Sequence, residues 1–230
     1  MTEREFDRYG DSYGAAVASS IGFAGQEHDF YVEAKARRLL ELAERRLGDP
    51  SQIRALDVGC GVGLTDKHLG AIGRLEGVDV SQPMVDQAAK ENPSVRYTVY
   101  DGNVLPFEDG RFDLAFAINV FHHVAPTSRL ALARELARVT RRSGVVAIFE
   151  HNPLNPLTRF VVSRCEFDEG VQLLSTREVR ELVAQAGLEP VERHYILFFP
   201  WKARFLQRLE MRLGAFPLGA QHLTAARRSD

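Results

Sequence analysis

Between residues 53 and 150 the chain alternates short apolar runs with segments of helical periodicity. A run that is apolar on both faces suits a strand that is buried on both faces, as in a parallel sheet covered by helices. The alternation therefore predicts an α/β fold with a Rossmann-like, mostly parallel sheet and helices on both faces. The predicted strands are residues 53–58, 74–80, 95–100, 113–118 and 145–150.

Further elements are predicted on either side of this core. Apolar residues recur at helical spacing over residues 36–47 and predict a helix, whereas residues 6–25 have no clear period and predict an irregular arm. Downstream, Ser175 and Glu178 fit the capping box of a helix that Gly187 ends. Two last strands are predicted over residues 188–197 and 220–226.

Composition limits the class of protein. The 230 residues are 45% hydrophobic, enough for one core, and 29 basic against 31 acidic residues give no basic excess for a nucleic-acid partner. Two cysteines, Cys60 and Cys165, are too few for a disulfide framework. The first residues do not resemble a secretory signal, and no run reaches the length of a membrane span. We expect a single cytoplasmic domain over residues 1–230.

A glycine-rich loop follows the first predicted strand. Gly59, Gly61 and Gly63 stand at alternate positions, so the backbone can bend sharply and a ligand can approach main-chain N–H groups. The dinucleotide pattern G-x-G-x-x-G fails, because Leu64 or Asp66 stands where the third glycine is needed. The loop therefore predicts a nucleoside-type ligand and disfavours a site for NAD.

Acidic residues end the next two predicted strands. Asp79 ends the second strand, where a carboxylate can accept hydrogen bonds from ribose hydroxyls. Asp101 ends the third strand and is followed by Gly102 and Asn103, where a carboxylate can accept from an adenine amino group. The carboxyl ends of parallel strands meet at one edge of a sheet, so these groups and the glycine loop should border one crevice.

At these residues the sequence resembles the class I S-adenosylmethionine-dependent methyltransferases. The matching segments are Asp57–Gly63, Asp79, Asp101 with Leu105-Pro106-Phe107, Phe112-Asp113-Leu114 and Ile118–Val124, which together cover roughly residues 50–150. The resemblance implies a seven-stranded sheet whose last strand pair is antiparallel, S-adenosylmethionine as the cofactor, and methyl transfer as the activity. It also divides the chain into an N-terminal arm and helix (1–49), a cofactor-binding core (50–150) and two substrate-side insertions (151–174 and 198–219).

The resemblance also implies roles for individual residues. The loop from Gly59 to Gly63 would hold the methionine part of the cofactor, Asp79 the ribose and Asp101 the adenine, with Met84 packed on the adenine ring. Lys35 is a candidate partner for the methionine carboxylate, although most helical lysines are solvated. The expected cofactor-binding residues are Tyr13, Asp57, Gly59, Cys60, Gly61, Gly63, Asp79, Val80, Met84, Asp101, Gly102, Asn103 and Asn119. No metal is expected.

Histidines supply the candidate catalytic residues. His122 and His123 follow the fourth strand, and His151 leaves the fifth in a turn rich in proline and asparagine. An imidazole can take the proton of a hydroxyl acceptor, so His151 and His123 are the candidate bases and O-methylation is favoured over N-methylation. The alternatives are a packing role for the paired histidines and a surface position for His151.

The acceptor is expected to be a small molecule and no nucleic acid. Residues 201–216 combine an arginine stripe with apolar residues at helical spacing, which suits a surface helix, a dimer contact, or a contact with a membrane or lipid-linked substrate. A protein that keeps the fold without methylating is a further alternative.

Overall fold

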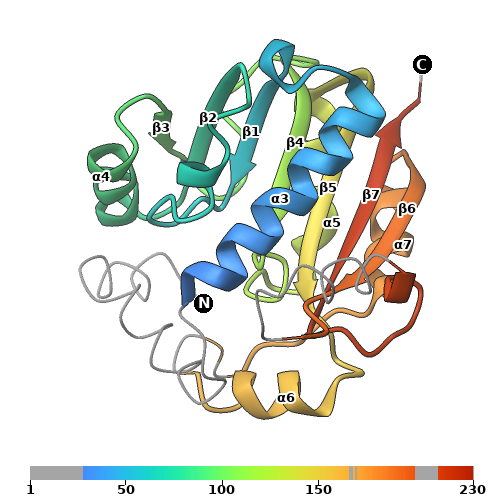
Figure 1. The fold of residues 1–230 in the computed structure, drawn as a ribbon. Helices are drawn as coiled ribbons and strands as arrows, with labels where there is room; N and C mark the ends of the chain where they lie inside the picture. The colour runs from blue at the N-terminus through green and yellow to red at the C-terminus, as the bar shows by residue number, and fades with distance from the viewer. Residues whose placement is uncertain (1–27, 166–167, 169, 200–211, 230) are drawn as a thin grey trace.

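The computed structural model describes residues 28–165, 168, 170–199 and 212–229 (Figure 1). Its helices are α3 (His28–Leu47), α4 (Gln82–Glu91), α5 (Arg129–Val139), α6 (Pro156–Val162) and α7 (Thr176–Gln185), with two short 3-10 helices, η3 (Pro50–Gln52) and η4 (Asp66–His68). Its strands are β1 (Arg54–Val58), β2 (Arg74–Asp79), β3 (Arg96–Val99), β4 (Phe112–Ile118), β5 (Thr140–His151), β6 (Leu188–Ile196) and β7 (Gln221–Arg228).

The strands form one seven-stranded sheet in the order β3-β2-β1-β4-β5-β7-β6. The first five strands pair in parallel, and β7 lies antiparallel between β5 and β6. The predicted Rossmann-like sheet and its antiparallel last pair are therefore confirmed. The chain leaves β1 toward β2 on one side and resumes at β4 on the other, so the carboxyl ends of β1 and β4 border the switch point where open α/β sheets bind ligands.

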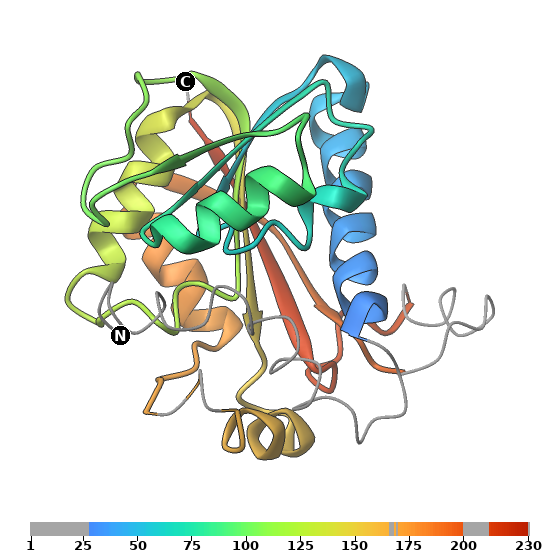
Figure 2. The ribbon, with the colours of Figure 1, turned by 90° about the vertical axis from the view of Figure 1, so that its left-hand side faces the viewer.

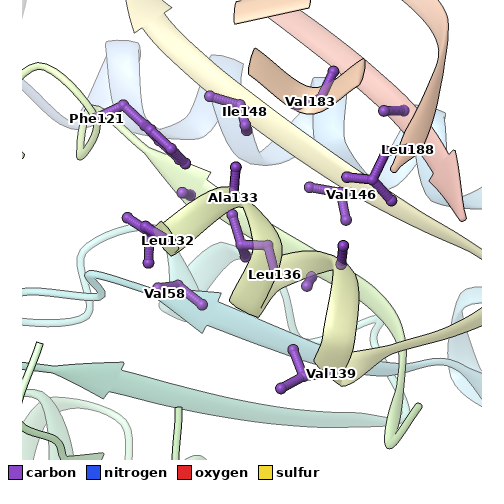
Figure 3. Packing of buried hydrophobic residues seen from close by; sticks show 14 of the residues in the cluster. Val58, Phe121, Leu132, Ala133, Leu136, Val139, Val146, Ile148, Val183 and Leu188 are labelled. Atoms are coloured by element: carbon purple, nitrogen blue, oxygen red, sulfur yellow. The ribbon is translucent and has the colours of Figure 1, made fainter. Parts of the chain in front are cut away.

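Helices cover both faces of the sheet, as Figure 2 shows. On one face α5 and α7 contribute Leu136 and Val183 to an apolar cluster with Val58 and Ile148 of the sheet (Figure 3). On the other face the apolar side of α3 packs on β4 and β5. Burial of the sheet on both faces accounts for the nearly continuous apolar strands of the sequence.

Most predicted elements are observed close to their expected bounds. The capping box of Ser175 and Glu178 begins α7, and Gly187 follows it with a φ of +84°. The fifth strand begins at Thr140 rather than at residue 145. Thr140 already pairs with Phe112 of β4, and the register shifts before the regular pairing that begins at Val145. Tyr13, the arm and most of residues 201–216 lie outside the described residues. None of the described helices is both long and apolar enough to cross a membrane.

Candidate functional site

The glycine loop after β1 is closed by packing on two sides and open on a third. All three glycines have positive φ values, where side chains are disfavoured. A Cβ at Gly59 would lie 2.5 Å from Val120 Cγ2, and one at Gly63 would lie 2.5 Å from Asn92 Nδ2. At Gly61 the nearest atom is Met84 Sδ, 3.9 Å away. The Val120 side chain therefore leaves no space for a side chain at position 59. At Gly61, by contrast, there is space that a ligand can occupy.

Asp79 joins the end of β2 to this open side. Its carboxylate accepts a hydrogen bond from the Gly61 N–H at 2.8 Å and another from the Ser81 N–H at 3.0 Å. The side chain is buried, so these contacts hold the carboxylate beside Gly61. A carboxylate can accept about four hydrogen bonds, which suits it to receive a pair of hydroxyls in the same place.

Asp101 lies just beyond β3 and is exposed. Its Oδ1 accepts the backbone N–H groups of Asn103 at 2.9 Å and Val104 at 3.1 Å, and these hydrogen bonds lower the pKa of Asp101. Gly102 turns the chain here with a φ of +79°, and its Cβ position lies 3.4 Å from Val80 Cγ1. The end of β3 thus presents an ionised carboxylate next to residues that follow β2.

Beneath the loop, Asp57 is a buried carboxyl. Burial, and then the neighbouring Asp66 carboxyl, raise the pKa of Asp57 well above its usual value. Tyr97 donates its hydroxyl to Asp66 Oδ2 at 2.6 Å. The Cys60 thiol is also buried, and burial raises its pKa, so it remains protonated and packs as a small apolar group. Asp57, Asp66, Tyr97 and Cys60 thus form a buried polar layer next to the loop.

Two further buried polar groups are Asn119, which follows β4, and Lys35 on α3. Asn119 follows β4 in a left-handed conformation with a φ of +58°, and its buried Oδ1 accepts no hydrogen bond from the described residues. Such an unmatched buried acceptor is costly, which marks a position for a ligand donor. Lys35 on α3 is buried; burial lowers its pKa to about 8, although Asp57 and Glu150 partly offset this effect.

At the ends of β4 and β5, His122 is held between two carboxylates. Glu150 is fully buried and accepts from the Phe121 N–H at 2.8 Å and from His122 Nδ1 at 2.5 Å. His122 Nε2 lies 3.3 Å from Asp168 Oδ1. Burial lowers the pKa of His122, but Glu150 and Asp168 outweigh it and raise the value to about 9. His122 is therefore an imidazolium that donates to Glu150 through Nδ1 and forms an ion pair with Asp168 through Nε2.

His123 and His151 lie against this imidazolium, with ring centroids 4.1 and 5.2 Å from that of His122. Burial and the charge of His122 lower the pKa of His123 to about 3 and that of His151 to about 4, so both rings are neutral at neutral pH. They differ in tautomer. Asp168 Oδ1 lies 3.4 Å from His123 Nε2 and can only accept, which leaves the lone pair on Nδ1. The Gln221 amide donates to His151 Nδ1 at 3.3 Å, which leaves the proton on Nε2.

The structure thus brings both candidate bases into one cluster with three residues that the sequence did not indicate: Glu150, Asp168 and Gln221. Glu150 had a signal, because it is a lone carboxylate at the end of an apolar strand. Asp168 and Gln221 had none, since only the fold brings them to His122 and His151. The ligand atoms of His122, His123 and Asp168 lie within 4.8 Å of one another, a spacing that a metal ion could bridge once His122 loses its proton.

Comparison with known proteins agrees with this geometry. Residues 56–148 match the family model of a methyltransferase domain. The malonyl-[acyl-carrier protein] O-methyltransferase of Pseudescherichia vulneris is 33% identical over 133 residues, which cover 57% of this chain and 52% of that protein. The chain therefore spans about half the length of this curated relative.

Solved structures show the same fold. A chain from the complex between the Haloferax volcanii Trm112 methyltransferase activator and a methyltransferase has a TM-score of 0.67 at 22% identity, with 98% of each chain covered. The cyclase SpnF has a TM-score of 0.61 at 19% identity, with 84% of this chain and 81% of that chain covered. The family model confirms the predicted resemblance to methyltransferases over residues 56–148, and the solved structures show the fold.

Proposed function

We propose that this chain, which carries a class I S-adenosylmethionine-dependent methyltransferase domain, transfers the methyl group of S-adenosylmethionine to a hydroxyl group of a small molecule. The observation that carries the proposal is the pairing of His123 with Asp168 beside the crevice. A hydroxyl needs a base to take its proton as the oxygen attacks, and a neutral, oriented imidazole can do so, although burial and the charge of His122 make both candidate rings weaker bases than an ordinary histidine. The malonyl relative is an O-methyltransferase, which also favours an oxygen acceptor.

The crevice residues fit the cofactor. The open side of the loop at Gly61 leaves room for it, and the Asp79 carboxylate beside that glycine would accept the ribose hydroxyls. Asn119 Oδ1 would accept from the ammonium group of the methionine part, and Lys35 would pair with its carboxylate. Asp101, at the end of β3, would receive the adenine amino group. When bound, S-adenosylmethionine supplies an electrophilic methyl group on a sulfonium.

The histidine cluster would position and deprotonate the acceptor. His123 takes the hydroxyl proton on Nδ1, and Asp168 holds Nε2–H and stabilises the imidazolium that forms. His122, fixed by Glu150, orients Asp168 for this task. His151 is the second candidate base; its proton-bearing Nε2 can also donate a hydrogen bond to the acceptor oxygen. Since displacement at the methyl needs an aligned nucleophile, much of the rate would come from proximity.

The test combines calorimetry with turnover. The protein should bind S-adenosylmethionine without responding to NADH, and a panel of hydroxyl acceptors should yield S-adenosylhomocysteine. His123→Ala should lower kcat about 10²- to 10⁴-fold with nearly unchanged cofactor affinity, as expected for loss of a base. His151→Ala measures the second candidate in the same assay. His194→Ala, which removes a partner of Glu192 outside the cluster, is the matched control.

An unchanged kcat in His123→Ala, with a reduced kcat in His151→Ala, would transfer the role of base to His151. Cofactor binding without turnover on any acceptor would favour the second candidate function, a protein that keeps the fold but does not methylate. The likeness of this chain to the cyclase SpnF is the observation that favours that alternative.

A further inference from the structure

Five large apolar side chains are exposed at one end of the molecule. Leu154, Leu157 and Phe160 lie on or just before α6, and Phe216 and Leu218 lie on the segment that leads into β7. Their exposed fractions are 59, 56, 47, 56 and 65%, in that order. Figures 1 and 2 both show α6 beyond the end of β5, away from the helices that cover the sheet. We refer to these five side chains as the end patch.

Hydrogen bonds join the two segments that carry the end patch. Asn152 Nδ2 donates to Gly219 O at 2.8 Å, Asn155 Nδ2 donates to Leu218 O at 2.7 Å, and Thr158 Oγ1 donates to Ala220 O at 2.9 Å. Side chains of one segment thus bind the backbone of the other next to the paired ends of β5 and β7. The end patch is therefore one supported surface. Contiguous exposed apolar residues of this kind mark an interaction site, whereas isolated ones do not.

The two segments that carry the end patch are basic. Residues 152–165 and 212–220 contain three arginines and no aspartate or glutamate. Arg159, Arg164 and Arg212 are all exposed, and the guanidinium of Arg164 lies 4.5 Å from the centre of the Phe160 ring. The surface therefore combines apolar side chains with positive charge, which matches the acyl region and the anionic headgroups of a bilayer.

We propose that the end patch binds the surface of a bilayer that contains anionic phospholipids. The leucines and phenylalanines enter the boundary between headgroups and acyl chains, and the arginines contact lipid phosphates. The interaction is peripheral. It overlaps the sequence expectation for residues 201–216 at Arg212 and Phe216, and it adds α6 to the surface.

The position of the end patch also bears on the acceptor. β5 ends at His151, and α6 begins at Pro156, so the surface adjoins the histidine cluster. A hydroxyl acceptor with an apolar tail could then reach the cluster from the bilayer. This consequence rests on the proposed function, whereas binding to a bilayer does not.

The experiment is co-sedimentation of the full chain with vesicles, without cofactor or acceptor. One set of vesicles contains phosphatidylcholine alone, and the other contains phosphatidylcholine with phosphatidylglycerol. The wild type should sediment with the anionic vesicles. The double variant Leu157→Ser/Phe160→Ser should bind them at least about tenfold more weakly. Serine has little apolar surface to bury in the bilayer, so the favourable burial of two large apolar side chains is lost. Arg159→Gln/Arg164→Gln should reduce the preference for anionic vesicles about tenfold.

Val104→Ser is the matched control, because Val104 is 60% exposed in the segment after β3, outside the end patch. It should bind like the wild type, and circular dichroism should show that every variant is folded. Failure of the wild type to bind anionic vesicles, or equal binding by the Leu157→Ser/Phe160→Ser variant, would overturn the proposal. A dimer that the same variant disrupts, without vesicle binding by the wild type, would assign the end patch to a second copy instead. Methyl transfer can fail independently of all these outcomes.

Discussion

Replacing Glu150 by glutamine tests the electrostatic description of the site. Glu150 is fully buried, and its carboxylate accepts from His122 Nδ1 at 2.5 Å. The substitution keeps the shape of the side chain and removes its charge, so the pKa of His122 should fall from about 9 toward or below its ordinary value of 6.5. The loss of a buried charge partner should also destabilise the protein at low and neutral pH.

The size of the effect follows from the pKa shift of His122. A rise from 6.5 to about 9 corresponds to about 3 kcal/mol, at 1.36 kcal/mol for each unit of pKa. Because the folded-state value is the higher one, this stabilisation is fully present below the unfolded pKa and is lost as the pH rises through about 9. Glu150→Gln should therefore lower the free energy of unfolding by at most about 3 kcal/mol near pH 6, because Asp168 still raises the pKa of His122, and the two proteins should converge above about pH 9.

The measurement is urea unfolding across this pH range, with the titration of His122 followed by NMR of histidine-labelled protein. NMR is needed because Lys35, whose pKa is lowered to about 8, changes stability in the opposite sense as the pH rises. Glu181→Gln is the control: it breaks the exposed pair with Arg177 and should change stability by less than about 1 kcal/mol. A His122 pKa that is the same in wild type and Glu150→Gln would refute the reasoning.

Four further predictions concern the loop and the fold. Asp79→Ala should weaken S-adenosylmethionine binding by about 1–3 kcal/mol, because the acceptor for the ribose is lost; an unchanged Kd in calorimetry would contradict its role. Gly59→Ala should lower the free energy of unfolding by about 1–3 kcal/mol, because its Cβ would lie 2.5 Å from Val120 Cγ2. Gly61→Ala should cost the fold only about 1 kcal/mol and mainly weaken cofactor binding, so a larger loss of stability than in Gly59→Ala would count against an open side at Gly61. Ser175→Ala should destabilise α7 by about 1 kcal/mol in thermal unfolding through loss of its cap, and no shift in Tm would argue that the cap is not formed.

The fold could be predicted because its signals are local. Strands buried on both faces need apolar side chains on both faces, so the core strands stand out along the sequence. The loop from Gly59 to Gly63 and the acids at Asp79 and Asp101 follow these strands directly. Parallel strands place their carboxyl ends at one edge, so their proximity could be inferred without coordinates. Where the fifth strand begins was predicted less well, because its pairing with β4 is irregular.

The reason for Gly59 illustrates a limit of this reasoning. The sequence indicated that the lack of a side chain at Gly59 leaves space for a ligand to approach the main chain. In the structure, the Val120 side chain occupies that space, and only Gly61 faces room for a ligand. The requirement for glycine was visible in the sequence. Its cause was not, because it depends on which residue after β4 packs against the loop.

The sequence by itself therefore determined the α/β fold and, through its resemblance to a family, indicated the cofactor class, because both depend on residues close together along the chain. Only the tertiary structure decided the chemistry of the histidines. His122 and His123 are adjacent in sequence, yet one is an imidazolium and the other is neutral. Glu150 and Asp168 impose this difference from distant parts of the chain, since a protonation state depends on the charges and burial around a ring and not on its neighbours in sequence.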